Sequence, residues 1–127
     1  MILYHGTDLD SALAILNHGL DGSKLNKLQT GRPTQIGIGW YSATEPEAAW
    51  FFASLAPGNQ DKGFTVIELE ISDVTIKQLV ASGQVMVTDI RNVPFVAKQV
   101  WFDINTFATV NREGVFRPCR NKEGFND

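Results

Sequence analysis

Two short segments carry the residue types that could do chemistry. Residues 3–7 are an apolar run that ends in His5, Gly6 and Thr7, and residues 39–43 present Tyr41. A lone histidine beside a glycine is common, so neither segment is informative by itself. In this order and at this separation, an imidazole, a glycine backbone and a phenol suggest a pocket for a flat aromatic amide such as nicotinamide.

The composition fits one folded domain. The chain has 127 residues, 43% hydrophobic and 20% charged, with a net charge of -3. This weak charge gives no reason to expect nucleic-acid or membrane binding. Cys119 is the only cysteine, which excludes an intramolecular disulfide and thiolate metal clusters, and we expect no metal. The sequence has neither a signal-peptide pattern nor an apolar run of membrane-spanning length, so we expect a cytoplasmic protein without a membrane partner.

Apolar patterning and capping residues predict three helices and at least five strands. The first helix should follow a cap at Asp8 or Asp10 and end at Gly19. The second should start at a Thr44 cap and run to residue 55, and the third should cover residues 74–82. Strands are expected over residues 2–5, 36–42, 64–71, 84–90 and 96–104, with 107–110 extending the sheet. This order predicts an α+β domain with a mixed, mostly antiparallel sheet.

Two segments read as irregular. Residues 21–37 form a long polar loop that carries Lys24, Lys27 and Arg32, and a basic loop near an active site could hold a phosphate, although a solvated surface loop is the simpler interpretation. From residue 112 on, the chain is polar and basic, so we expect a folded domain over residues 1–111 and a weakly structured tail over residues 112–127.

The motifs together resemble the ADP-ribosyltransferase superfamily, in its diphtheria-toxin and poly-ADP-ribose-polymerase branch, often labelled H-Y-E. They are Tyr-His-Gly-Thr at 4–7, then a helix and Gly19, then Gly-Trp-Tyr-Ser-Ala at 39–43, then Ala-Ala and an aromatic from 48. The resemblance is dense over residues 3–55 and weaker through 102. It implies a fold of split, mixed or antiparallel β-sheets with three short flanking helices. The fingerprints G-x-G-x-x-G and G-x-x-x-x-G-K-[ST] are absent.

The resemblance also implies roles for single residues toward NAD, which this family consumes as a substrate. His5 would bind the ribose hydroxyls on the adenosine side, and the backbone of Gly6 would pair with the nicotinamide carboxamide. Tyr41 would stack on the nicotinamide ring. The second stacking aromatic would be Phe52, or Phe51 with a one-residue gap. Thr7 and Ser42 complete the two motifs, and the candidates for the diphosphate are Lys24, Lys27 and Arg32.

The same residues also have simpler interpretations, in which they serve the fold and bind no ligand. Alone, His5 reads as a core histidine at a strand end, and Tyr41, Phe51 and Phe52 could be core aromatics. Glu68 and Glu70 share one face of a strand, which is most simply the solvent face.

The third family residue, a glutamate on a late strand, is replaced here by Gln99. Glutamine keeps a hydrogen bond to a ribose hydroxyl but loses the charge that stabilises an oxocarbenium-like ribose. Losing one such contact typically costs about 10²–10³ in rate. Asp103, Glu68 and Glu70 are weak candidates for a replacement carboxylate. Some toxin-like members of the superfamily use a glutamine in this site, so catalysis remains an option.

Three functions follow from the resemblance. The leading expectation is a toxin- or effector-like mono-ADP-ribosyltransferase, with Gln99, Tyr41 and His5 as catalytic residues and a protein or nucleic acid as acceptor. The alternatives are an NAD glycohydrolase and a module that binds NAD or ADP-ribose without catalysis. A toxin of this kind could also have an antitoxin or immunity protein as a partner.

Overall fold

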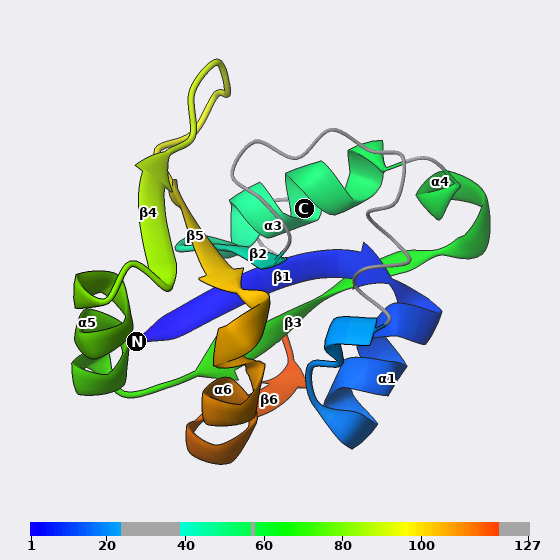
Figure 1. The fold of residues 1–127 in the computed structure, drawn as a ribbon. Coiled ribbons are helices and arrows are strands. Elements are labelled where there is room, and N and C mark those ends of the chain that lie inside the picture. Colours follow the sequence, from blue (N-terminus) through cyan, green and yellow to red (C-terminus); the bar gives the residue numbers. More distant parts are fainter. Residues whose placement is uncertain (24–38, 57, 120–127) are drawn as a thin grey trace.

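The computed structural model describes residues 1–23, 39–56 and 58–119 of the chain. It is an α+β domain built on one antiparallel sheet of six strands in the order β4-β5-β2-β1-β3-β6 (Figure 1). The strands are β1 Ile2–Asp8, β2 Gly39–Ala43, β3 Phe64–Glu70, β4 Val85–Asp89, β5 Lys98–Asp103 and β6 Val115–Pro118. Helices flank the sheet on both faces and cover most of its apolar side chains, although Met86 and Val87 of β4 stay exposed.

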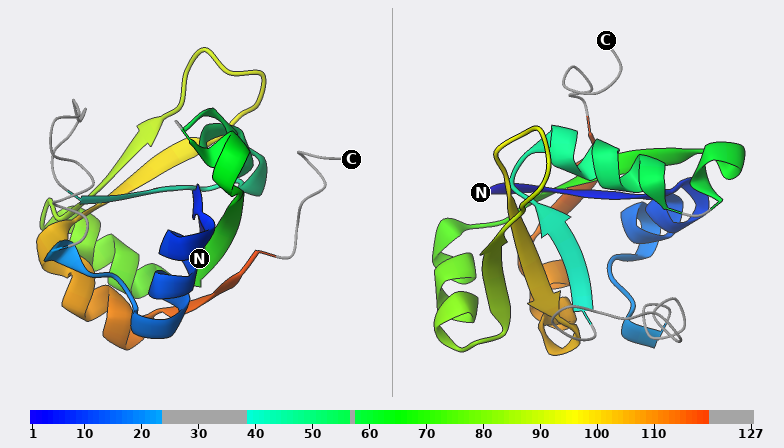
Figure 2. Two further views of the ribbon diagram at one scale, coloured as in Figure 1. Left: turned by 90° about the vertical axis from the view of Figure 1, so that its right-hand side faces the viewer. Right: turned by 90° about the horizontal axis from the view of Figure 1, so that it is seen from above.

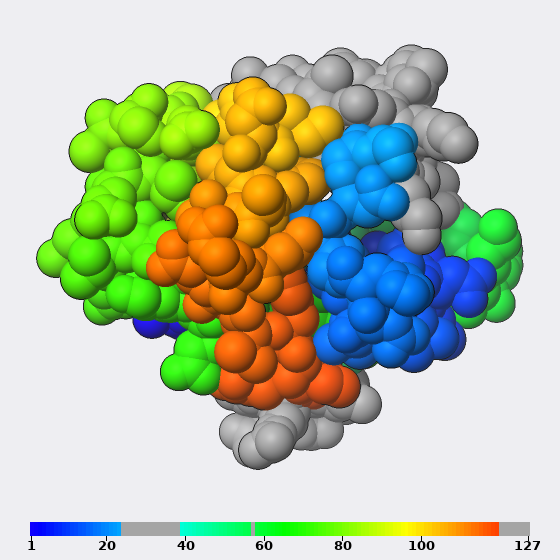
Figure 3. Space-filling view, turned by 60° about the horizontal axis from the view of Figure 1, so that its bottom comes forward, coloured from blue at the N-terminus to red at the C-terminus, as the bar shows by residue number. Residues whose placement is uncertain are grey.

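The helices divide between the two faces. Helix α3 Pro46–Leu55 and the short α4 Asn59–Lys62 lie on one face, and α1 Leu9–His18, α5 Asp73–Ala81 and α6 Phe107–Glu113 lie on the other (Figure 2). The larger core fills the second face, with Leu3, Trp40 and Phe102 almost fully buried. On this face α1, α6 and β6 lie side by side (Figure 3). None of the helices within the described ranges combines the length and the apolarity needed to cross a bilayer.

Local sequence signals explain several element boundaries. Asp8 caps α1 by accepting a hydrogen bond from Ser11 N at 2.7 Å, and Gly19 ends the helix with φ +77, which favours glycine. Ser72 caps α5 in the same way through Val74 N. The Thr44 cap is wrong: Glu45 occupies the N-cap of α3, and the Thr44 hydroxyl instead accepts a hydrogen bond from Lys98 N at 2.9 Å, next to β5.

The sheet is weakest between β1 and β2. Strand β1 pairs with β3 along its whole length, from Ile2 to Asp8, and β2 pairs with β5 along its whole length. Between them, β1 and β2 pair at a single position, Tyr4 opposite Ala43. The sheet is therefore nearly divided into the halves β4-β5-β2 and β1-β3-β6. At the seam between β1 and β2, a side chain can extend from one face of the sheet toward the other.

Several expectations about the elements were wrong. All pairings among the described strands are antiparallel and join one sheet, so the sheet is neither mixed nor split in two. Five helices flank it within the described residues, rather than the three expected. Residues 107–110 belong to helix α6, because Phe107 and Val110 point together into the core at helical spacing.

The tail expected from residue 112 is also wrong for the described residues. Helix α6 continues to Glu113, and β6 pairs with β3 at the edge of the sheet. The Arg117 guanidinium lies 3.0 Å from Glu68 and 2.9 Å from Glu70, so the two carboxylates of β3 anchor the added strand. Glu68 is therefore buried rather than on a solvent face, while Glu70 stays exposed. Residues 120–127 lie outside the described range.

Candidate functional site

Six of the residues predicted for the site line one cavity of about 200 Å³. They are His5 and Gly6 from β1, Tyr41 and Ser42 from β2, Phe52 from α3 and Gln99 from β5. Tyr4, Ala43, Ala49 and Ile90 complete the wall of this space, which we call the α3 cavity. Its volume equals roughly six or seven waters, enough for one small ring and too little for a dinucleotide.

The side chain of His5 links β1 to β2 across the seam between these strands. Its Nδ1 lies 2.6 Å from the carbonyl oxygen of Tyr41, and because a carbonyl only accepts, Nδ1 must carry the proton. Burial lowers the pKa of His5 to about 4, an effect that the bond to Tyr41 and the charge of Asp8 only partly oppose. The imidazole is therefore neutral at physiological pH, and Nε2 is left as a hydrogen-bond acceptor.

Gly6 is required by packing whether or not a ligand binds. A methyl group built on Gly6 would collide with the backbone oxygen of Ala49 and would lie 2.6 Å from Cβ of Ala53. Helix α3 thus rests directly on the backbone of β1. The sequence offered one reason for glycine here, close approach of a ligand, and the structure supplies a second.

Two aromatic side chains border the α3 cavity from different elements. Tyr41 is half-buried on β2, and Phe52 on α3 keeps 45% of its surface exposed beside the cavity. Phe51, the alternative to Phe52, does not line it. Its ring packs edge-on against Phe52 and Phe95, at centroid distances of 5.4 and 5.6 Å. Phe52 therefore lines the α3 cavity and Phe51 does not, a choice that the sequence left open.

The chemistry at Gln99 differs from that of a carboxylate site. Gln99 is half-buried on β5, opposite Ala43, and its side chain lines the α3 cavity. The candidate replacement acids are engaged elsewhere: Asp103 accepts a hydrogen bond from Asn105 N, and Glu68 and Glu70 pair with Arg117. No described acid lines this cavity.

The remaining predicted residues fall outside this cluster or serve the fold. The Ser42 hydroxyl donates to the Val100 carbonyl at 2.8 Å, which ties β2 to β5. Thr7 lines a different cavity. Arg32, with Lys24 and Lys27, lies outside the described residues. In the described part of the chain, no group of three or more histidine, cysteine or acidic side chains could hold a metal ion.

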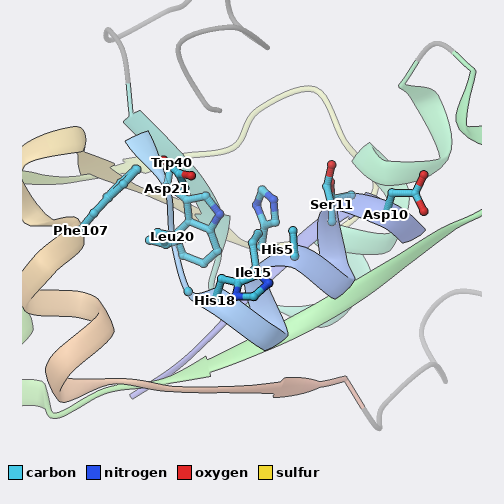
Figure 4. Close-up of a pocket in the computed structure, with 12 residues that line it drawn as sticks. His5, Asp10, Ser11, Ile15, His18, Leu20, Asp21, Trp40 and Phe107 are labelled. Carbon is cyan, nitrogen blue, oxygen red and sulfur yellow. The ribbon is translucent and has the colours of Figure 1, made fainter. Parts of the chain in front are cut away.

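A second, larger cavity of about 480 Å³ lies on the opposite side of His5. We call it the α1 cavity, since α1 and the turn after it form most of its wall, and Trp40 and Phe107 close it (Figure 4). Of the predicted residues it contains only His5 and Thr7. Asp10, His18 and Asp21, which the sequence did not indicate as site residues, contribute polar groups. Its size lies within the range of about 300–1,000 Å³ that is usual for small-molecule sites.

Asn111 fixes the turn that forms one wall of the α1 cavity. Its side-chain oxygen accepts from Leu20 N at 2.8 Å, and its amide donates to Leu20 O at 3.0 Å. These bonds join the turn after α1 to helix α6, over a separation of 91 residues. No local sequence pattern could have predicted this cavity.

Comparison of the chain with protein-family models, with curated proteins and with solved structures finds no match.

The geometry allows a specific kind of chemistry. The two cavities share His5, whose Nε2 can accept a hydrogen bond from a hydroxyl group. A ring-sized group would fit the α3 cavity, which Tyr41, Phe52 and Gln99 line.

Proposed function

We propose that this protein is an NAD-consuming mono-ADP-ribosyltransferase, which transfers ADP-ribose to a protein or nucleic-acid acceptor. The observation that carries the proposal is the α3 cavity. Residues chosen from three separate stretches of sequence, around residues 5, 41 and 52, and from the late strand at Gln99 line one space of ring size. The nearly divided sheet at the β1–β2 seam is consistent with the split-sheet fold of that superfamily.

In the proposed complex the nicotinamide ring occupies the α3 cavity. Tyr41 and Phe52 contact its faces, and such stacking is worth about 1–3 kcal/mol per ring. The bond between the ribose C1′ and the pyridine nitrogen breaks, and both electrons pass to nicotinamide, which leaves as a neutral molecule. The acceptor's lone pair then forms the new bond to C1′, and the acceptor gives up a proton to solvent.

Side chains hold the two riboses of NAD during this step. His5 Nε2 accepts a hydrogen bond from a hydroxyl of the adenosine-side ribose, and the Gln99 amide binds a hydroxyl of the nicotinamide-side ribose. Because Gln99 carries no charge, the oxocarbenium-like ribose is stabilised by hydrogen bonding alone. We therefore expect slow turnover, about 10²–10³ below that of a site with a carboxylate at this position.

A second function is favoured by the same observation. With Gln99 in the cavity and the nearby described acids engaged elsewhere, the domain would bind NAD or ADP-ribose without cleaving it. This alternative and the transferase share the binding site and differ in the chemical step.

Incubation with NAD labelled in the adenosine half, in a cell lysate, tests the transferase proposal. Label on protein, or on nucleic acid, that is lost in a Gln99→Ala variant supports it and identifies the acceptor class. Nicotinamide release at the same rate with and without lysate, and no labelled macromolecule, would instead identify a glycohydrolase. Binding of NAD without any nicotinamide release would identify the inactive module.

A further inference from the structure

Strand β4 forms one rim of the sheet and pairs on one side only, with β5 (Figure 1). Among the described residues, no strand lies on its other side. Four of its five residues are exposed, and two of these, Met86 and Val87, are apolar and keep 43% and 45% of their surface exposed. Apolar side chains on an unpaired edge favour the addition of another strand.

The hydrogen-bond pattern shows which backbone groups this edge offers. Ile90 N donates to the carbonyl of Ala97 at 3.1 Å, and in an antiparallel ladder such hydrogen-bonded pairs recur at every second position. The N–H and C=O groups of Val85, Val87 and Asp89 therefore point away from β5, toward the open side. Their spacing is the one that a further antiparallel strand requires.

Strand β4 lacks most of the features that protect an edge strand from pairing. Its sequence has no proline and no lysine, and its five pairs with β5 are consecutive, so no bulge interrupts it. Its single charged residue, Asp89, lies at the end of the strand, with the Lys98 ammonium 3.8 Å from the carboxylate. The strand at the opposite edge, β6, carries the ion-paired Arg117 and ends at Pro118.

We propose that two copies of this chain associate through β4, as antiparallel strands related by a two-fold axis at Val87. In this register the two Val87 residues pair with each other, and Val85 of each copy pairs with Asp89 of the other. The outward backbone groups then meet as hydrogen-bonded pairs and exchange about six bonds. Met86 of each copy lies opposite Thr88 of the other.

Charge favours a second copy in this orientation. The antiparallel register sets Asp89 opposite Val85, so no two like charges face each other, and the ion pair of Asp89 with Lys98 is kept. A parallel arrangement would set two Asp89 carboxylates side by side. The sequence of β4 is therefore complementary to itself in one orientation, as an interface with two-fold symmetry requires.

The small size of the interface sets its strength. Five residues from each copy bury less than the roughly 800 Å² per partner of a stable complex. We therefore expect a weak, reversible dimer with a dissociation constant of about 10–100 μM. The added strand lies two strand spacings, about 10 Å, from β5 and leaves the α3 cavity open. The inference is thus independent of the proposed NAD chemistry.

Sedimentation velocity of the full chain tests the association. Between about 5 and 500 μM protein, the average mass should rise from that of a monomer toward that of a dimer. Val87→Lys sets two ammonium groups at the two-fold axis and should weaken association about tenfold. The control Val115→Lys changes a valine of the other edge strand, which is 59% exposed, and should alter association less than twofold. A wild-type chain that stays monomeric throughout, or an equal loss in the two folded variants, would overturn the proposal.

Engineered cysteines test the register. Met86 and Thr88 of the two copies form a non-hydrogen-bonded pair with a Cα separation of about 4.5 Å, which a disulfide can span. With oxidised glutathione as oxidant, a mixture of Met86→Cys and Thr88→Cys chains should form a linked heterodimer, and neither variant alone should link to itself. Self-linkage of one variant would move the two-fold axis to that residue. A dimer seen by sedimentation without any linkage would overturn pairing through β4.

Discussion

Replacement of Gly6 by alanine separates the packing role of this residue from a ligand-binding role. The added methyl carbon would lie 2.6 Å from Ala53 Cβ and would collide with the Ala49 carbonyl oxygen. Nonbonded carbons prefer about 3.5–4.0 Å, so α3 must move away from β1 by roughly 1 Å. Overpacking typically costs about 1–3 kcal/mol, and a collision with backbone cannot be relieved by a rotamer change. We expect the upper part of that range.

Thermal unfolding measures this cost. For a chain of this size, about 2–3 kcal/mol lowers Tm by roughly 6–15 °C. Adding Ala53→Gly to Gly6→Ala should recover less than the full loss, because the Ala49 backbone remains in place. A Gly6→Ala variant with an unchanged Tm would refute the packing argument. If that variant also lost NAD binding, the glycine would serve the ligand alone.

Three further predictions concern charge. Arg117→Met should lower the free energy of unfolding, measured in urea, by about 2–3 kcal/mol. The reason is that it leaves the carboxylate of Glu68, whose side chain is 10% exposed, without its ion-pair partner. An effect no larger than that of Glu70→Gln would argue against a buried ion pair. Acid should destabilise the fold through His5. Between the ordinary pKa of 6.5 and the folded-state pKa of about 4, His5 takes up a proton only in the unfolded chain. The free energy of unfolding therefore falls as the pH drops through this window, by up to about 3 kcal/mol. The variant His5→Gln should lose that dependence, and an identical pH profile for wild type and variant would contradict it. Gln99→Glu should raise nicotinamide release by about 10²–10³, and an unchanged rate with NAD bound would place charge stabilisation elsewhere.

The elements that could be predicted from sequence are those fixed by local signals. The Asp8 cap and Gly19 define α1, and Ser72 defines the start of α5, because caps act within a few residues. Strand β3 was recognisable from its alternation, and β5 from its apolar centre. The order of elements indicated an α+β domain with mostly antiparallel pairing, but it did not exclude the parallel pairs that the structure lacks among its described strands.

What could not be predicted depends on contacts between distant residues. Strand β6 exists because it pairs with β3, and its four residues have no periodicity of their own. A signal for it was present in retrospect: Glu68 and Glu70 on one face of a strand need a basic partner, and Arg117 supplies it. The short run at residues 107–110 was ambiguous between helix and strand, and the turn capped by Asp103 decides for helix.

The candidate site was predictable in part for the same reason. Motifs indicated His5, Gly6, Tyr41, Phe52 and Gln99, which line one cavity, but they could not choose between Phe51 and Phe52. The α1 cavity was missed because its walls come from β1, α1, β2 and α6, and because the bond from Asn111 that joins the turn after α1 to α6 spans 91 residues. From the sequence Trp40 reads as an ordinary core aromatic, and only the structure shows that its Nε1 has no hydrogen-bond partner among the described residues.

Calorimetric titration with NAD tests the central claim most directly. The claim is that Tyr41 and Phe52, from separate elements, form one slot for the nicotinamide ring. Wild type should bind NAD, Tyr41→Ala should bind it roughly 5- to 150-fold more weakly, and Phe51→Leu, beside the cavity but not in it, should bind like wild type. Absence of NAD binding to the folded wild-type chain, or equal affinity in the wild-type and Tyr41→Ala chains, would contradict the account.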